Sequence, residues 1–146
     1  MMNLSVRLMR LSEVGLIVDY FHEASPEHLE TMGVDPSRLP PRDIWLERLN
    51  ANLAHPSAER ETLQTLWLGN GAPLGFSTAD KIVSGERANM HLHIFAADDR
   101  NRGCGAACVR LTADLYFDML ELKRLFCEPN AFNVAPNRTL QAAGFK

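Results

Sequence analysis

The segment Arg100-Asn101-Arg102-Gly103-Cys104-Gly105 has the residue types and spacing of a site for a diphosphate group. It follows a strand-like stretch and precedes an amphipathic, helix-like one. Glycines at such a turn let the backbone approach a bulky ligand, and the first amides of a helix have no partner within the helix. These amides and the helix dipole attract phosphate, and Arg100 and Arg102 add two positive charges. The pattern predicts a nucleotide-diphosphate site, although an ordinary glycine-rich helix start would contain the same residues.

Three side chains in the same half of the chain could accept a proton from a nucleophile: Glu128, His91 and His93. Glu128 ends an expected buried strand, and a partly buried carboxylate has a raised pKa, which suits a general base. The two histidines alternate onto one face of another expected strand. Structural roles explain these residues too. The glutamate could be solvated or hold a loop amide, and a histidine could pack against a helix layer.

Hydrophobic periodicity predicts the elements that position these residues. We expect strands over residues 4–9, 62–68, 73–78, 89–96 and 122–128, and helices over about 12–21, 26–32, 42–53, 104–119 and 136–143. Ser25-Pro26 and Gly33 delimit the second helix, and Asn70-Gly71 is typical of a hairpin turn. Hairpins in the middle, followed by strand–helix–strand–helix, predict one α/β domain over residues 1–146, with a mixed α+β sheet.

Packing within these elements can also be predicted. We expect an apolar side on each of two helices, formed by Ile44, Leu46, Leu49 and Leu53 in one and by Leu111, Leu115 and Met119 in the other. Trp45 and Trp67 are expected in the core. Gly75, inside an expected strand, indicates a bulge or a close approach of two backbones.

Composition excludes several classes of function. With 146 residues, 46% hydrophobic and 23% charged, the chain is long enough for one domain with its own core. A net charge of −3 does not suggest nucleic acid as a partner. No apolar run approaches the roughly 20 residues that span a bilayer, and we see no secretion signal. Cys104, Cys108 and Cys127 form no disulfide framework or metal-ligand pattern, so we expect a cytoplasmic protein without a metal.

Three motifs together carry a family resemblance. The first is the strand ending His91–Phe95, followed by Arg100-x-x-Gly103-x-Gly105, and the second is the strand Lys123–Glu128. The third runs from Asn133 to Phe145 and resembles an Asn-x-x-Ser-x-Arg-x-Leu-x-x-x-Gly-Phe ending. In order and spacing they resemble the GNAT superfamily of acetyl-CoA-dependent N-acetyltransferases, especially the branch containing ribosomal-protein N-terminal acetyltransferases. The motifs cover residues 60–146, and the first 60 residues match by element order.

The resemblance implies a GNAT-like fold, in which helices flank a mostly antiparallel sheet and two parallel strands splay apart. Acetyl-CoA would lie in the gap between strands 89–96 and 122–128, with its pantetheine arm bonded to the backbone of the first. Its pyrophosphate would bind at the glycine turn. The implied contacts are Ile94, Phe95, Ala96, Arg100, Arg102, Gly103, Cys104, Gly105, Ala106, Asn133, Asn137 and Arg138.

The implied activity is transfer of an acetyl group from acetyl-CoA to a primary amine of a small molecule or a protein N-terminus, by direct attack in a ternary complex. Glu128 matches a strand glutamate that is the base in some relatives. His91 and His93 resemble a His-x-His pair of others, displaced by two residues.

Two substitutions depart from the family pattern. Leu140 stands where many members have a tyrosine that protonates the leaving thiolate, and Pro136 replaces a serine. A non-catalytic acyl-CoA-binding sensor or regulatory module is therefore the alternative function. A dinucleotide-binding fragment, with Glu121 as the ribose ligand, is a weaker one, because the glycine spacing is one residue short.

The acceptor amine would lie against the first two helices and the loop before the third. That region contains a mixed, somewhat acidic set, His22, Glu23, His28, Glu30, Asp35, Arg38 and Asp43. The set suits a cationic amine, although a solvated helix surface has a similar composition. The sequence stops at Lys146, where family members continue into a last strand or hairpin. We therefore expect either a truncated chain or final strands supplied otherwise, for example by a partner. A homodimer is a separate alternative for the assembly.

Overall fold

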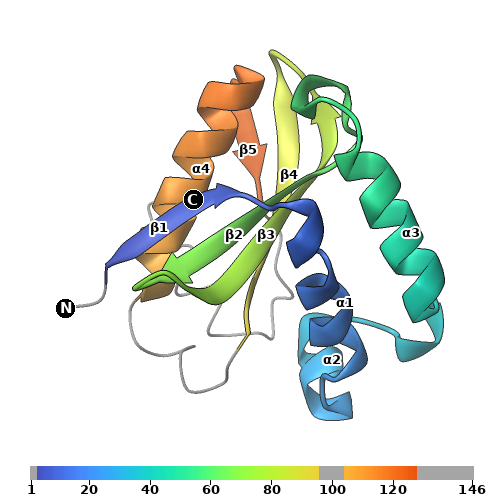
Figure 1. Ribbon diagram of the computed structural model, residues 1–146. Helices are drawn as coiled ribbons and strands as arrows, with labels where there is room; N and C mark the ends of the chain where they lie inside the picture. The colour runs from blue at the N-terminus through green and yellow to red at the C-terminus, as the bar shows by residue number, and fades with distance from the viewer. Residues whose placement is uncertain (1–2, 96–103, 128–146) are drawn as a thin grey trace.

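The structure is a computed structural model that describes residues 3–95 and 104–127. Within these ranges one sheet has the strand order β1 (Leu4–Leu8), β2 (Leu63–Gly69), β3 (Ala72–Val83), β4 (Arg87–Ile94) and β5 (Arg124–Phe126) (Figure 1). Neighbouring strands are antiparallel except β4 and β5, which are parallel. The helices are α1 (Gly15–His22), α2 (Pro26–Met32), α3 (Arg42–Leu53) and α4 (Cys104–Leu120). The expected mixed sheet, mostly antiparallel with two parallel strands, is confirmed.

The sheet separates two hydrophobic cores because successive strand residues point to opposite faces. Trp67 and Met90 pack with Val109 of α4 on one face. Leu66 and Phe76 pack with α1 and α3 on the other (Figure 1). The expected alternation in β4 is confirmed, since Leu92 and its even-numbered neighbours face α4 while the histidines face away from it.

A chain of buried hydroxyl groups fixes α4 against the sheet. Thr65 Oγ1 and Ser77 Oγ lie 2.6 Å apart, and Ser77 Oγ lies 2.6 Å from the Tyr116 hydroxyl. Trp67 Nε1 donates to Thr112 Oγ1 over 2.8 Å. Burial raises the pKa of Tyr116, so its hydroxyl stays protonated. Because buried polar groups must find partners, these contacts allow one register of the helix on the sheet.

Helix ends and turns follow the local chemistry of the sequence. Ser25 Oγ accepts from the His28 amide at the start of α2, and Gly33, with φ of 74°, ends that helix. The Asn70-Gly71 turn has φ values of 52° and 81°, as expected for a hairpin of two twisted strands. These predictions are confirmed.

Several predicted boundaries and faces are wrong. β3 continues to Val83 rather than ending at residue 78, because it pairs with β4 through an irregularity near Lys81, whose φ is 49°. β5 is only Arg124–Phe126. On α4, Leu111 and Met119 are exposed, and the buried face is formed by Cys108, Val109, Thr112, Tyr116 and Leu120. The helix has more apolar residues than its buried face needs, so apolar spacing alone misplaced that face.

The third helix gives a similar mixed result. Its expected bounds, 42–53, are confirmed, but Ile44 is exposed. Leu53 is buried, and Trp45 is half-buried against Phe21, with ring centroids 5.4 Å apart. Trp67 is fully buried. The expected core position is therefore confirmed for Trp67 and only partly for Trp45.

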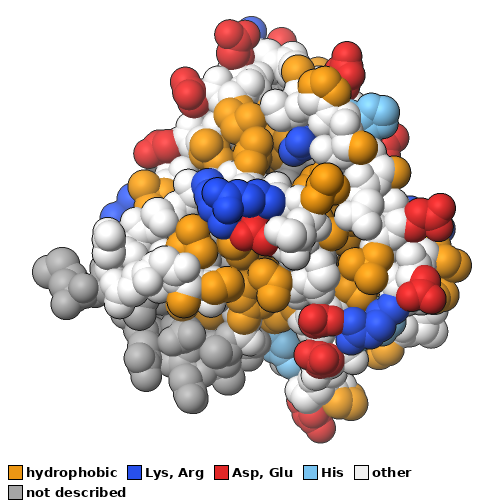
Figure 2. Space-filling view, in the orientation of Figure 1, with side chains coloured by type: hydrophobic (Ala, Val, Ile, Leu, Met, Phe, Trp, Pro, Cys, Tyr) orange, Lys and Arg blue, Asp and Glu red, His pale blue; other side chains and the backbone are white. Residues whose placement is uncertain are grey.

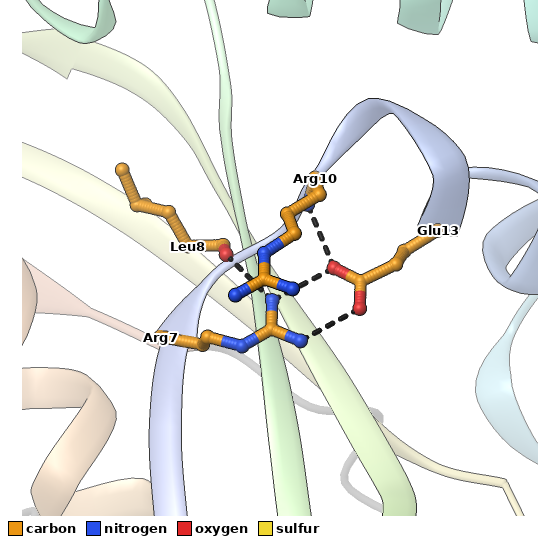
Figure 3. Close-up of polar contacts among 4 residues, drawn as sticks. All are labelled: Arg7, Leu8, Arg10 and Glu13. Atoms are coloured by element: carbon orange, nitrogen blue, oxygen red, sulfur yellow. Dashed lines mark hydrogen bonds and ion pairs between the residues drawn. The ribbon is translucent and has the colours of Figure 1, made fainter.

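An ion pair joins the first strand to the 3₁₀ turn that precedes α1. Arg7 Nη1 and Nη2 donate to the two Glu13 carboxylate oxygens over 2.8 and 2.7 Å, and the Arg10 amide donates to Glu13 over 2.8 Å (Figure 3). The side chains are 32% and 18% exposed, for Arg7 and Glu13 respectively. The hydrogen bond from Arg7 lowers the pKa of Glu13 to about 2. Glu13 thus closes a 3₁₀ turn, Leu11–Glu13, where the sequence predicted a helix start at Ser12.

Gly75 lies on β3 between two neighbouring strands. It pairs with Trp67 of β2 and Ile94 of β4, and Leu74 is the extra residue of a bulge beside it. A Cβ atom at this position would collide with the His93 carbonyl oxygen and lie 3.1 Å from Ile94 Cα. The predicted close approach is confirmed, and it sets the path of the last residues of β4.

The surface of the described residues has no dominant charge on the face in view. Figure 2 shows acidic and basic side chains dispersed over it, with hydrophobic side chains exposed between them. Among the described helices, none is both long enough and apolar enough to cross a membrane.

Replacing Glu13 with glutamine tests the junction between β1 and α1. Because the pKa of Glu13 is lowered, its stabilisation is fully present above the unfolded pKa near 4.5 and is lost as pH falls through about 2. We expect Glu13→Gln to lower the free energy of unfolding by about 1.5–3 kcal/mol at pH 7, as for a hydrogen bond to a charged group. The difference should shrink between pH 5 and 2 in urea denaturation. The exposed Glu47→Gln on α3 is the control and should change little; an equal loss at pH 2 and pH 7 would contradict this account.

Replacing Gly75 with alanine tests the close approach of the strands. The added methyl group meets backbone atoms of β4, so the strands must separate, and we expect a loss of about 1–3 kcal/mol in chemical denaturation. The matched control is Gly15→Ala, where a Cβ atom has nothing within 4 Å. It should leave stability unchanged or slightly raised. If Gly75→Ala is as stable as the wild type, the approach of β3 and β4 is looser than described.

Candidate active site

The two parallel strands pair over only part of their length. β4 and β5 are joined by three residue pairs, Arg87↔Arg124, Ala88↔Leu125 and Asn89↔Phe126. β5 ends there, whereas β4 continues to Ile94 while still bonded to β3 on its other edge. Among the described residues, the ladder between the two parallel strands is therefore shorter than β4 itself. A strand edge beyond such a ladder can bond an extended, amide-containing ligand.

The first turn of α4 lies toward the same end of β4. The Gly85 amide donates to the Leu120 carbonyl over 2.9 Å, which places the end of α4 beside the start of β4. The helix therefore runs back along the sheet, and its first described turn lies toward the end of the sheet at which β4 ends (Figure 1). Gly105 is buried and Ala106 is half-buried in the first described turn of α4.

Aromatic rings surround His93, near the end of β4. Its imidazole stacks on Phe76 with ring centroids 4.9 Å apart, and its centroid lies 5.1 Å from that of Tyr20 and 5.1 Å from that of Phe21. The side chain is half-buried, on the face of the sheet that α1 covers. Such packing limits the orientations available to the ring.

His91 has different surroundings. Its side chain is 52% exposed, and its Nε2 lies 3.1 Å from Asp80 Oδ2. A carboxylate can only accept a hydrogen bond, so this contact places a proton on His91 Nε2. The structure therefore separates the two predicted histidines: one is held among rings, and the other pairs with a carboxylate on an exposed part of the sheet.

Of the side chains predicted to line the acceptor site, His28 is connected to His93 through Tyr20. Its Nε2 is 2.7 Å from the Tyr20 hydroxyl, and Tyr20 in turn contacts the His93 ring. The others are engaged elsewhere or exposed. Glu23 pairs with Arg42 over 3.8 Å, Asp35 caps a 3₁₀ turn, and His22 Nε2 bonds the Pro40 carbonyl oxygen over 2.9 Å. Glu30, Arg38 and Asp43 are exposed, which fits the interpretation as a solvated surface.

The predicted cofactor contacts fall into two groups. Ile94, Phe95, Cys104, Gly105 and Ala106 lie within the described residues, at the end of β4 and the start of α4. The Phe95 amide already donates to the Leu74 carbonyl over 3.0 Å, so it is committed to β3 rather than to a ligand. The remaining predicted residues lie outside the described ranges: Ala96, Arg100, Arg102, Gly103, Glu128, Asn133, Asn137 and Arg138.

Sequence reasoning missed Tyr20, Phe76 and Asp80. The sequence places Tyr20 in the helix expected over residues 12–21 and predicts no contact for its hydroxyl group. Its hydroxyl contact with His28 joins residues eight apart across a helix break, which periodicity does not reveal. Among the described residues, no group of three or more histidine, cysteine, aspartate or glutamate side chains could hold a metal ion.

Comparison with known proteins gives matches in structure only. No protein-family model matches the sequence, and a comparison with curated proteins found no match. Aminoglycoside acetyltransferase AAC(6')-Ib in complex with coenzyme A superposes with a TM-score of 0.76 and 17% identity, over 99% of this chain and 84% of that one.

Two further solved structures have similar scores. Ribosomal-protein-S5-alanine acetyltransferase from Vibrio fischeri has a TM-score of 0.77 and 19% identity, with 98% of this chain and 79% of that chain covered. Spermidine N-acetyltransferase from Vibrio cholerae, in complex with CoA and spermine, has a TM-score of 0.77 and 15% identity, over 97% and 79% of the two chains. The chain therefore has the fold of the GNAT N-acetyltransferases, as its motifs predicted.

Proposed function

We propose that this protein transfers an acetyl group from acetyl-CoA to a primary amine, by direct attack within a ternary complex. The observation that carries the proposal is the short parallel ladder of β4 and β5, which ends at Asn89 among the described residues, in a fold shared with N-acetyltransferases that were crystallised with CoA. Low sequence identity to these neighbours leaves the acceptor open, so the proposal covers small-molecule amines and protein N-termini alike.

Acetyl-CoA would bind with its pantetheine arm along β4 beyond the ladder and its pyrophosphate at the start of α4. The arm contains two amide groups, which can bond to a strand edge as an added strand does. The glycine turn before α4, with Arg100 and Arg102, would hold the pyrophosphate. This arrangement directs the thioester toward the end of β4, the part of the strand that contains His93 and Ile94.

The acceptor amine would attack the thioester carbonyl carbon from the face covered by α1. A neutral amine is needed, so a base must take one proton from the ammonium group, directly or through water. The new C–N bond forms, the attacking nitrogen passes its second proton to water, the C–S bond breaks, and the thiolate takes a proton from water to become free CoA. A backbone amide near the thioester would stabilise the negative charge that develops on the carbonyl oxygen.

We propose His93 as the base, because it is half-buried near the end of β4 on the face that the acceptor would reach. His91 is the weaker of the two histidine candidates, since it is more exposed and its Nε2 proton is held by Asp80. Glu128 is the competing base on sequence grounds. Water could protonate the leaving thiolate, since Leu140 stands in the position of the family tyrosine.

The activity can be tested by calorimetry and by thiol release. We expect acetyl-CoA, but not NAD, to bind, and we expect free thiol to appear when acetyl-CoA is mixed with at least one member of a panel of primary amines and N-terminal peptides. Binding without any turnover would favour the alternative, a non-catalytic acyl-CoA sensor. Binding of NAD alone would favour the dinucleotide-binding alternative, and no binding at all would rule out all three.

Three glutamine variants identify the base once an acceptor is found. We expect His93→Gln to lower kcat by about 10²–10⁴-fold, the usual contribution of general-base catalysis, while acetyl-CoA affinity measured by calorimetry is retained. Glu128→Gln and His91→Gln should each lower kcat much less. A large loss in Glu128→Gln with a nearly normal His93→Gln would transfer the role of base to the glutamate.

A further inference from the structure

One side chain beside His93, that of Tyr20, connects three elements of the fold. Tyr20 lies on α1, and its ring contacts that of His93 on β4, with centroids 5.1 Å apart. Its hydroxyl lies 2.7 Å from His28 Nε2 and 3.4 Å from Met32 Sδ, both on α2. Tyr20 therefore connects the candidate base with the short helix next to it.

Packing restricts the Tyr20 ring on several sides. Its centroid lies 5.1 Å from that of Phe21, 5.5 Å from that of Phe76 and 6.0 Å from that of Phe95, with planes at steep angles. Edge-to-face contacts of this kind favour a fixed ring orientation. Phe76 also stacks on His93, so Tyr20 and Phe76 hold two sides of the same imidazole.

The hydroxyl contact has a different consequence, because it acts on α2. This helix has only seven residues, and short helices depend on tertiary contacts. Its buried residue Leu29 supplies an apolar contact, and His28 supplies a polar one to Tyr20. Loss of the hydroxyl would therefore loosen α2 without removing the ring that packs on His93.

We propose that Tyr20 is the positioning residue for His93, and that its bond to His28 fixes α2 beside the candidate base. The inference rests on the proposed function, in which His93 takes the proton of the amine and α2 lines the acceptor side. Tyr20 itself touches no reacting atom. Its ring sets the orientation of the imidazole, and its hydroxyl sets the place of α2.

The two roles can be separated by two variants of the same residue. Tyr20→Leu removes both the ring and the hydroxyl, and we expect kcat to fall about tenfold or more, since a misplaced catalytic group reacts slowly. Tyr20→Phe keeps the ring. It should restore most of kcat but raise the KM of the acceptor severalfold, because contacts that hold the substrate equally in the ground and transition states affect KM alone. Acetyl-CoA affinity should stay the same in both variants.

His28→Gln tests the partner of the hydroxyl. It should raise the acceptor KM as Tyr20→Phe does, and the double variant should add little, since both changes break one contact. The chain offers a matched control in its only other tyrosine, Tyr116, which is buried on the opposite face of the sheet. Tyr116→Phe also removes a hydroxyl group and should leave the KM of the acceptor unchanged. If Tyr116→Phe raises the acceptor KM as much as Tyr20→Phe does, lost stability explains both increases in KM, and the proposal is overturned.

A readout that needs no turnover distinguishes a failure of this inference from a failure of the proposed function. Imidazole signals in ¹H–¹⁵N spectra report the tautomer and the surroundings of each histidine. We expect the His93 signals to shift in Tyr20→Leu and to stay close to wild type in Tyr20→Phe, and the His28 signals to change in both. Unchanged His93 signals in a folded Tyr20→Leu protein would overturn the positioning role. Failure of acetyl-CoA to bind would instead overturn the proposed function, and the spectra would still test whether Tyr20 positions His93.

Discussion

The arrangement of the candidate site depends on one constraint, the unequal pairing of the two edges of β4. One edge is bonded to β3 along most of the strand, whereas the other is bonded to β5 over only three residue pairs. Among the described strands, it is therefore β3 that pairs with the end of β4. Gly75 makes this feasible because it lets the backbones of β3 and β4 approach without a side chain between them. Buried hydroxyl groups on the α4 face of the sheet and aromatic rings on the α1 face then hold the helices against the sheet.

The two faces of the sheet are stabilised by different chemistry. On the α4 side, buried hydroxyl groups and the Trp67 indole bond to one another, so the helix has a single register. On the side of α1 and α2, aromatic rings pack around His93, and the polar contacts lie at the margin of the cluster. The α4 layer keeps the strands in place. In the proposed function, a substrate would enter from the opposite face, where the helices α1 and α2 are short.

Much of the fold could be predicted because local chemistry and global fold agree. Ser25 and Gly33 delimit α2, Asn70-Gly71 forms the hairpin, and the bounds of α3 are as expected. The face of α4 could not be predicted, since Leu111 and Met119 are as apolar as the residues that are buried. In the site, the alternation of β4 placed His91 and His93 on one face, but the pattern could not reveal that one meets Asp80 and the other a group of rings. Those differences come from contacts between residues distant in the sequence.

The two tryptophans give the molecule a property that its sequence alone does not suggest. Trp67 lies in the core beneath α4, and Trp45 lies half-exposed on α3 against Phe21, so the two indoles occupy opposite sides of the sheet. Indole emission shifts to longer wavelength as water gains access to the ring. The chain thus contains one optical reporter for the hydroxyl-bonded layer and another for the layer of short helices, and replacing either indole with phenylalanine would isolate the signal of the other.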